Sequence, residues 1–502
     1  MEVAGAAILV LIIAISCLLF ISAWKAKVSR GNLPPGPTPL PLLGNVLQVR
    51  TGDMVTSLMK LSKKYGPVFT VYLGTRRVVV LCGYEAVKEA LVNQGDVFSG
   101  RGELPTFNKV TQDFGVVFSN GERWKQLRHF SLKALRDVGM GKRSTEERVQ
   151  EEAQCLVEEF RKTKGLPFDP TFFLCQAVCR VMSTILFGNQ VNYDDKEFLA
   201  LVSMIDANFQ LMSSFWGQLY DIFPNIAKHL PGPHNRIFKC FERLAEFAGK
   251  RVEQSQKTLD PNDPRDFVDH FLIRMEQEKQ NPLSEVSIKD LVVTALTVFF
   301  GATETVGTTL RYGLLILMKH PDVEGKVQEE LDRVIGRSRS PAMEDRSKMP
   351  YTDAVVHEIQ RYSNLLPLNL CHAVTQDAYF RGYTIPRGTN VFPLLTSVLR
   401  DPARFSDPYS FNPGHFLDEK GGFKKNDAFM PFSTGKRICL GEGLARMQLF
   451  IYFTTILQHF TLKRCLDLEN IDLTPKECGF GNIPRSYQLA VVPRGRSHED
   501  DS

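Results

Sequence analysis

The amino-acid sequence predicts one large, mainly α-helical domain with a small β part, preceded by an N-terminal transmembrane helix. Three observations lead to this prediction. The chain begins with a long uncharged apolar run, helix-length segments dominate as far as about residue 365, and nothing divides residues 34–494 into independent halves. Apolar residues make up 43% of the 502 residues, which is enough for a large core.

The N-terminal run has the length of a membrane span. No residue between Glu2 and Lys25 is charged, and about 22 residues at about 1.5 Å each cover the hydrocarbon thickness of a bilayer. Lys25, Lys27 and Arg30 follow the run, so the positive-inside rule places the rest of the protein in the cytosol. We expect residues 1–24 to be an uncleaved membrane anchor; a cleaved signal peptide and a buried helix are the alternatives.

A basic, proline-rich linker is predicted for residues 25–41. Five prolines fall between Leu33 and Pro41. Because proline fixes φ and lacks an N–H donor, this stretch should be a stiff, extended spacer. The main domain then covers residues 42–494, and the polar tail 495–502 is expected to be disordered.

The main domain begins with a β-hairpin pattern. Residues 68–73 and 77–81 are rich in Val, Leu and aromatic residues and flank Gly74-Thr75-Arg76. Helical segments follow, interrupted by Pro231-Gly232-Pro233, which marks a loop between helices. After about Thr384 the chain becomes irregular.

Two further helices are predicted. One lies near 447–459, before short strands. The other, Asp290–His320, is apolar enough to be taken for a second membrane span. However, the charged residues Glu304, Arg311 and Lys319 lie within it at intervals, and a carboxylate in the middle of a span is costly in lipid. We therefore predict a long helix buried in the domain core.

Composition and motifs exclude several functions. A net charge of +5 is too small to indicate a nucleic-acid binder. Ten cysteines include no CxxC pair, so zinc-ribbon spacing is absent. The glycines at 441–446 and 139–143 do not complete a dinucleotide or phosphate loop. If the protein does redox chemistry, its electrons must come from a partner.

The strongest chemical signal is the segment FSTGKRICLG at residues 432–441. It resembles the haem loop of the cytochrome P-450 family, F-x-x-G-x-R-x-C-x-G, at every fixed position. The resemblance implies a cytochrome P-450 fold, with Cys439 as the metal ligand, an axial thiolate on haem iron, and Arg437 paired with a haem propionate. Such a thiolate favours cleavage of the O–O bond. A cysteine buried in an ordinary loop is the alternative.

Other motifs extend the resemblance along the chain. Glu358 and Arg361 match the structural E-x-x-R pair, and their spacing puts both on one helix face. His415 stands where many family members have a third cation. This substitution is common in microsomal members, and it makes the third contact titratable.

Four residues resemble propionate contacts of the family. Trp124 and Arg128 match W-x-x-x-R, whereas Arg101 and His372 match two positions of the microsomal branch. The resemblance implies that all four bind the cofactor. Taken alone, each would be an ordinary surface or core residue.

The distal segment of the family resembles residues 300–305. Glu304 and Thr305 match its acid–alcohol pair, which the resemblance implies is catalytic and delivers the two protons that O2 cleavage requires. A Thr hydroxyl can also bond the carbonyl one turn back in its helix. Ala302 departs from the usual Gly, and its methyl narrows the expected oxygen groove. The alternative is a core threonine beside an ion-paired glutamate.

The branch resembled is the second family of vertebrate microsomal members, on the basis of Pro34–Pro37, Arg143 and Pro231–His234. Those members are anchored in the endoplasmic reticulum membrane with a cytosolic catalytic domain, and they oxidise drugs, fatty acids and steroids. By position, the substrate pocket is expected to include Phe107, Phe118, Phe209, Phe300, Leu365, Leu366, Leu370 and Phe480.

The expected function is therefore insertion of one atom of O2 into lipophilic small molecules. The cofactor would be haem b (iron protoporphyrin IX). An NADPH-dependent flavoprotein reductase would supply electrons, with cytochrome b5 as an optional second donor. A haem sensor without turnover and a haem-thiolate isomerase are the alternatives, and the pair Glu304–Thr305 favours the monooxygenase because only O2 activation needs proton delivery.

Overall fold

The computed structural model describes residues 15–16, 31–50, 52–140, 142–188, 195–282 and 284–495. The predicted anchor, except for Ile15 and Ser16, and the tail from residue 496 lie outside these ranges, so the structure tests neither prediction. The described chain is mainly helical with a small β part, as predicted.

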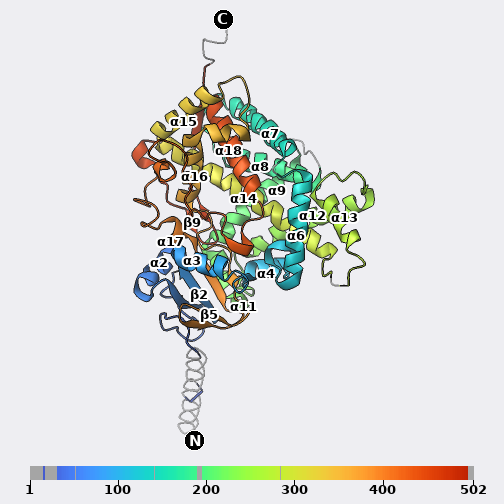
Figure 1. Ribbon diagram of the computed structural model, residues 1–502, viewed down its shortest axis with the longest axis vertical. Helices are drawn as coiled ribbons and strands as arrows, with labels where there is room; N and C mark the ends of the chain where they lie inside the picture. The colour runs from blue at the N-terminus through green and yellow to red at the C-terminus, as the bar shows by residue number, and fades with distance from the viewer. Residues whose placement is uncertain are drawn as a thin grey trace.

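The helices alternate with short connections through most of the chain (Figure 1). Those up to the long central helix are α2 (Met54–Tyr65), α3 (Tyr84–Lys88), α4 (Pro105–Thr111), α5 (Gly115–Phe118), α6 (Gly121–Val138), α7 (Arg143–Lys162), α8 (Thr171–Phe187), α9 (Lys196–Ser213), α10 (Phe215–Ile222), α11 (Pro224–Ala227), α12 (Asn235–Thr258), α13 (Phe267–Gln277) and α14 (Ile288–Lys319). The later helices are α15 (Pro321–Val334), α16 (Pro350–Ser363), α17 (Leu395–Leu399) and α18 (Glu442–His459). A π-helical turn, η1 (Glu89–Asn93), and four 3-10 turns complete the set: η2 (Met343–Lys348), η3 (Pro413–Phe416), η4 (Gly435–Arg437) and η5 (Leu468–Asn470).

The strands form one five-stranded sheet and three small ribbons. The large sheet has the order β1-β2-β7-β4-β3, with β2 and β7 parallel and the other pairs antiparallel. Its strands are β1 (Val68–Leu73), β2 (Arg76–Cys82), β3 (Gly100–Arg101), β4 (His372–Ala373) and β7 (Asn390–Leu394). The ribbons pair β5 (Ala378–Phe380) with β6 (Tyr383–Ile385), β8 (Phe460–Arg464) with β11 (Leu489–Pro493), and β9 (Glu477–Cys478) with β10 (Asn482–Ile483).

The predicted hairpin and helix breaks are confirmed. β1 and β2 pair in the antiparallel register that joins Leu73 to Arg76. Pro231-Gly232-Pro233 lies between α11 and α12. Before the hairpin, the carbonyls of Pro34 and Pro35 accept hydrogen bonds from the side chain and backbone of Thr70. The proline-rich stretch therefore lies along β1.

α14 is the central helix of the core, as predicted from its charged residues. Among the described residues it is the single helix long and apolar enough to cross a membrane, and most of that stretch is buried in the fold. The pair α9–α10 passes the same test jointly but bends by 62° between its members. α14 packs against α5, α8, α12, α16 and α18 (Figure 1). A Cβ on Gly313 would overlap the ring of Phe453 in α18, so glycine there permits the close approach.

The N-terminus of α14 is fixed by local hydrogen bonds. Ser287 and Asp290 form a reciprocal capping box, in which each side chain accepts the other's backbone N–H. Asp290 also accepts the N–H of Gly115 from α5. These contacts fix the N-terminal end of α14 against α5, the helix that follows α4 in the chain.

Candidate active site

The segment 432–441 folds into a tight loop that ends at the N-terminus of α18. The N–H of Cys439 donates to the carbonyl of Phe432 at 3.0 Å and closes the loop. Gly435 has φ +74°, and a Cβ there would overlap the carbonyl oxygen of Leu91 in η1. Only glycine therefore satisfies both the left-handed backbone and the contact with η1.

The sulfur of Cys439 is held among backbone donors. Burial raises the pKa of the Cys439 thiol, whereas N–H donors of Gly441 and Glu442 lower it, as does the guanidinium of Arg128. Its side chain nevertheless keeps accessible surface. A side chain that is surrounded by protein and yet accessible borders an interior space. The Cys439 thiol is therefore surrounded by protein and faces an interior space.

One face of α14 also keeps accessible surface, as the Cys439 side chain does. Val298, Gly301, Ala302 and Thr305 keep accessible surface, although most of their neighbours in the helix are buried. Their spacing of three, four and seven residues puts them on one side of the helix. Thr305 Oγ1 donates to the carbonyl of Gly301 at 2.8 Å, which is the predicted bond one turn back.

A cluster of three cations, one buried and two half-buried, lies beside the loop. Arg101, Arg128 and Arg437 repel one another electrostatically, and burial and the other two guanidiniums lower the pKa of Arg437. Arg437 donates to the carbonyls of Ser99 and Ser119 at 2.8 Å.

Aromatic and backbone contacts orient this cluster. The guanidinium of Arg437 lies 3.7 Å above the ring centre of Trp124. Arg101 donates to the carbonyl of Val117 at 3.0 Å, and Arg128 donates to that of Ile438 at 2.8 Å. The five predicted cofactor-binding residues other than Cys439 therefore come together, with His372 joining Arg101 across the β3–β4 pair.

His372 has a defined tautomer. Its Nδ1 lies 2.8 Å from the carbonyl of Phe98, and a carbonyl can only accept, so Nδ1 carries the hydrogen. Burial and the charge of Arg101 lower the pKa of His372 to about 3. Nε2 of His372 and Nη1 of Arg437 are buried without a hydrogen-bond partner among the described residues.

These features fit a haem with its propionates. A guanidinium remains charged in proteins, and three of them close together, with Arg437 buried and Arg101 and Arg128 half-buried, favour an anionic partner. The unpartnered Nη1 of Arg437 can donate to a carboxylate, and an anion beside His372 would favour its protonated, doubly donating form. The inward-facing thiol supplies the soft ligand that iron accepts.

Glu304 does not share the surroundings of Thr305. Its carboxyl group is 1% exposed and turns towards α8 and α9, where Oε1 accepts from Thr308 Oγ1 at 2.8 Å. Burial raises the pKa of Glu304 to about 8, and the nearby carboxylate of Asp206 adds to this effect. Glu304 is therefore a buried acid one residue away from the alcohol.

A closed ring of phenylalanines lies next to this part of α14. Phe300 contacts Phe209 and Phe241, and all three belong to the core around Phe107 and Phe480. Ring centres 5.1–6.5 Å apart join the circle in the order Phe107, Phe241, Phe300, Phe209, Phe480 and back to Phe107. Phe118 stacks on Phe107 at 4.5 Å.

The predicted pocket residues thus include four of the five ring members, and the sequence analysis missed the fifth, Phe241. It lies on α12, and its amphipathic pattern gives no signal that separates it from ordinary core positions. Leu365 is tied to the same region, because its carbonyl accepts the N–H of Asn482 at 2.8 Å. Leu366 packs on the same core as a half-buried side chain.

The E-x-x-R motif is fully buried. Arg361 donates to both oxygens of Glu358 at 2.6–2.7 Å, and to the carbonyls of Leu399 and Pro408. Nδ1 of His415 lies 3.1 Å from Glu358, and its Nε2 faces the carbonyl of Ser406. Both ring nitrogens of His415 thus lie next to atoms that accept hydrogen bonds.

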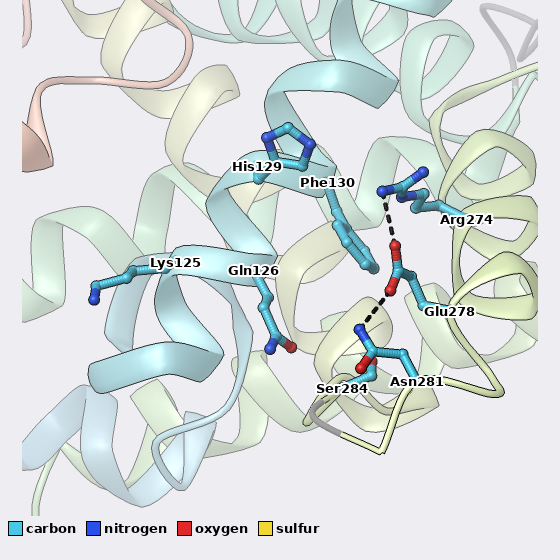
Figure 2. A pocket seen from close by; sticks show the side chains of 8 residues that line it. All are labelled: Lys125, Gln126, His129, Phe130, Arg274, Glu278, Asn281 and Ser284. Atoms are coloured by element: carbon cyan, nitrogen blue, oxygen red, sulfur yellow. Dashed lines mark hydrogen bonds and ion pairs between the residues drawn. The ribbon is translucent and has the colours of Figure 1, made fainter.

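A separate surface pocket of about 290 Å³ lies between α6 and α13 (Figure 2). Its floor is Phe130, and Arg274, Glu278 and Asn281 are joined at its rim by an ion pair and a hydrogen bond. The predicted site residues do not line it. It is therefore distinct from the interior site.

The comparisons agree with this geometry. The family model described as Cytochrome P450 matches residues 34–491. Cytochrome P450 2G1 of Oryctolagus cuniculus and Cytochrome P450 2A13 of Homo sapiens are each 56% identical over 494 residues, which cover 98% of this chain and 100% of each relative. Cytochrome P450 2A5 of Mus musculus is 57% identical over 480 residues, covering 96% of this chain and 97% of the relative.

A helical fold with an inward-facing thiol, a cation cluster and a helix that carries an accessible threonine is the arrangement expected of a haem-dependent oxygenase. The chain belongs to the cytochrome P450 family. It is a monooxygenase of lipophilic small molecules that contains haem iron, uses O2 and receives electrons from a redox partner reductase.

Proposed function

We propose that haem b is held by Cys439 as thiolate ligand and by Arg101, Trp124, Arg128, His372 and Arg437 around its propionates. The main observation that supports this proposal is the cluster of Arg101, Arg128 and Arg437. One buried and two half-buried guanidiniums, with a tryptophan face stacked on the buried one, form a site suited to two carboxylates. When bound, the thiolate-ligated haem activates O2 and allows one of its atoms to be inserted into a substrate.

Thr305 and Glu304 are proposed to deliver protons to the distal side. The Thr305 hydroxyl donates to Gly301 and keeps its lone pairs on the half-buried face of α14, where it can accept a hydrogen bond from water. Glu304 is a buried acid whose raised pKa, about 8, keeps it protonated at neutral pH. In this relay Glu304 is the proton source, and water carries the proton to the Thr305 hydroxyl, which lies on a different face of α14.

The phenylalanine ring is proposed to select the substrate. Five touching aromatic side chains offer broad apolar surface, and phenyl rings contain no hydrogen-bonding atoms. Compact apolar and aromatic molecules therefore fit the pocket best.

We also propose anchoring in the endoplasmic reticulum membrane, with an NADPH-dependent flavoprotein reductase and optionally cytochrome b5 as electron donors. Exposed apolar side chains support a membrane contact. They belong to the segment before β1 and to α10–α11, at the end of the molecule where the large sheet lies (Figure 1): Leu42, Leu43, Leu47, Phe215, Ile226 and Leu230.

The test of proton delivery is the variant Thr305→Ala. It should bind haem and accept electrons normally but divert reducing equivalents into hydrogen peroxide. The ratio of oxidised product to NADPH consumed should fall severalfold, less than the roughly 10²-fold minimum for a positioned acid, because water can replace the hydroxyl. Substrate-dependent NADPH consumption also separates a monooxygenase from a sensor or an isomerase.

Thr309→Ala is the matched control. Thr309 Oγ1 donates to the carbonyl of Thr305 at 2.7 Å, the same bond on the same helix, one turn further along. It should leave the ratio unchanged, and Thr305→Ser should restore it. If the wild-type protein is well coupled and Thr305→Ala is equally so, Thr305 has no part in proton delivery. A poorly coupled wild type would instead point to the methyl of Ala302.

A further inference from the structure

Two buried side chains and one half-buried side chain, from three helices, meet at the acid of the proposed relay. The carboxyl oxygens of Glu304 (α14) and Asp206 (α9) and the sulfur of Cys175 (α8) all lie within 4.8 Å of one another. Glu304 and Cys175 are each 1% exposed, whereas the side chain of Asp206 is 20% exposed. Arg311 is buried next to them, and its Nη1 donates to Asp206 at 3.3 Å.

The hydrogen bonds of Glu304 are incomplete. Oε1 accepts from Thr308, but Oε2 is buried and has no hydrogen-bond partner among the described residues. A buried carboxylate oxygen without a partner is costly, whereas a protonated carboxyl group can donate to a neighbouring carboxylate. Asp206 is the neighbour that can accept such a hydrogen bond.

The charges of the Glu304 and Asp206 carboxyl groups also favour a hydrogen bond between the two groups. Two carboxylates this close cannot both ionise easily in a buried site, so one proton binds to the pair. Burial raises the pKa values of both groups, Glu304 to about 8, and Arg311 opposes the shift in each. One proton and one guanidinium leave the pair electrically neutral.

The other groups that face the pair come from several elements. Cys175 and Cys179 belong to α8, and burial raises the pKa of each thiol, so both remain uncharged. Around Asp206, Gln210 donates a hydrogen bond, and the charges of Asp169 and Lys476 act in opposite directions.

A metal ion at this cluster is disfavoured. Arg311 already supplies a buried positive charge, which would repel a cation. A metal would also require the Cys175 thiol to lose its proton, and burial raises its pKa well above the usual value.

We propose that Asp206 is a positioning residue for Glu304, with which it shares one proton, while Arg311 balances the remaining charge. Because Asp206 is partly exposed, it connects the pair with solvent. When Glu304 gives its proton to water beside Thr305, a proton from solvent enters through Asp206 and restores the pair. No electrons move in this exchange. The proposal rests on the proposed function of Glu304 as a proton source.

The test is the infrared carbonyl stretch of the protonated carboxyl group in the resting haemoprotein, followed against pH. The band of Glu304 is assigned as the difference between wild type and Glu304→Gln. In Asp206→Asn, which keeps an oxygen for Arg311, the titration midpoint of this band should fall by at least about one pH unit, a tenfold loss in proton affinity. Asp169→Asn is the control, because it removes the same charge near Asp206 without belonging to the pair, and it should cause a smaller change.

The outcomes separate this inference from the proposed function. An unchanged midpoint in Asp206→Asn overturns the shared proton, whatever the coupling ratio. If the midpoint falls but Glu304→Gln is as well coupled as wild type, the pair exists and the proton-delivery role of Glu304 is wrong. Should Asp206→Asn fail to fold, Asp206→Ser replaces it. A wild-type band that titrates near the ordinary pKa of glutamate also contradicts the proposal.

Discussion

The thiol of Cys439 has two backbone donors and a nearby cation, whereas the buried Cys371 has one backbone donor. N–H donors of Gly441 and Glu442 and the charge of Arg128 oppose the effect of burial at this sulfur. At Cys240, by contrast, burial raises the pKa to about 12. A thiolate is thus best supported at Cys439, where donors are aimed at the sulfur.

Cys439→Ser should therefore abolish the red-shifted absorption band that the reduced protein forms with carbon monoxide, because a hydroxyl is a poor substitute for the thiolate. Cys240→Ser is the matched control. Its sulfur contacts the carbonyl of Met204, to which a hydroxyl can also donate. A band that survives in Cys439→Ser shows that another residue is the ligand.

At the residue scale, motif positions could be predicted and their neighbours could not. Cys439, Arg437 and Thr305 stand in recognisable patterns. Phe241 and Asp206 lie on helices whose sequences carry no chemical motif, and only packing brings them to Phe300 and Glu304. The sequence pattern also did not predict the direction of the Glu304 side chain, because it placed Glu304 and Thr305 in one site although adjacent helix positions point to different faces.

At the scale of elements, the buried pair Glu358–Arg361 joins α16 to η3 and the loops before it. Arg361→Ala would leave the buried carboxylate of Glu358 with only His415 and the backbone N–H of Asn412 as partners. Breaking a buried pair typically costs about 3–5 kcal/mol, and the free energy of unfolding in urea should fall accordingly. Arg143→Ala removes an arginine from an exposed ion pair, with a side chain 90% accessible, and should change little.

α15 and β8 are joined by a second buried carboxylate. Glu324 Oε1 accepts the N–H of Leu462 at 2.7 Å, and burial raises the pKa of Glu324 to about 7. The folded state therefore binds this proton more tightly than the unfolded state. The resulting stability is present below the ordinary glutamate pKa and is lost as pH rises through about 7.

Glu324→Gln removes the buried charge and keeps the acceptor oxygen. At pH 8 the variant should be more stable than wild type by up to about 3 kcal/mol, and this advantage should shrink as pH falls towards 5. Urea unfolding of both proteins at the two pH values measures the difference. An advantage that is independent of pH would assign the effect to packing and not to ionisation.

Elements with strong local signals were the predictable ones. The β1–β2 hairpin has a turn between two β-branched runs, and α14 has a long apolar stretch with charges at its end. The pairing of β2 with β7 was not predictable, because it joins strands more than 300 residues apart with no local pattern. The short strands β3 and β4 are defined only by that sheet.

At the scale of the whole molecule, the described residues form a packed core that does not include the predicted anchor. α14 and its neighbours contain the core, and the proline-rich stretch attaches to β1 through Thr70. Deleting residues 1–24 should therefore release much of the protein from membranes while haem binding persists. Sedimentation with microsomes and the carbon monoxide spectrum of the soluble fraction measure the two effects.

Some truncated protein should remain bound through the exposed apolar residues near α10 and α11. Replacing Leu43 and Ile226 by Ser in the truncated chain should reduce this remainder, since their side chains are 46% and 61% exposed. Loss of haem from the truncated chain would mean that residues 1–24 belong to the catalytic fold.

The closed phenylalanine ring also has a calorimetric consequence. Four of its members are almost wholly buried, Phe480 is half-buried, and neighbouring rings meet edge to face or tilted. A guest that binds among these rings therefore exchanges hydrated apolar surface for aromatic contact. Removing apolar surface from water lowers the heat capacity. The enthalpy of binding should therefore become more favourable on warming while the affinity changes little. Across a series of guests, the heat-capacity change should follow apolar area and be insensitive to added polar groups.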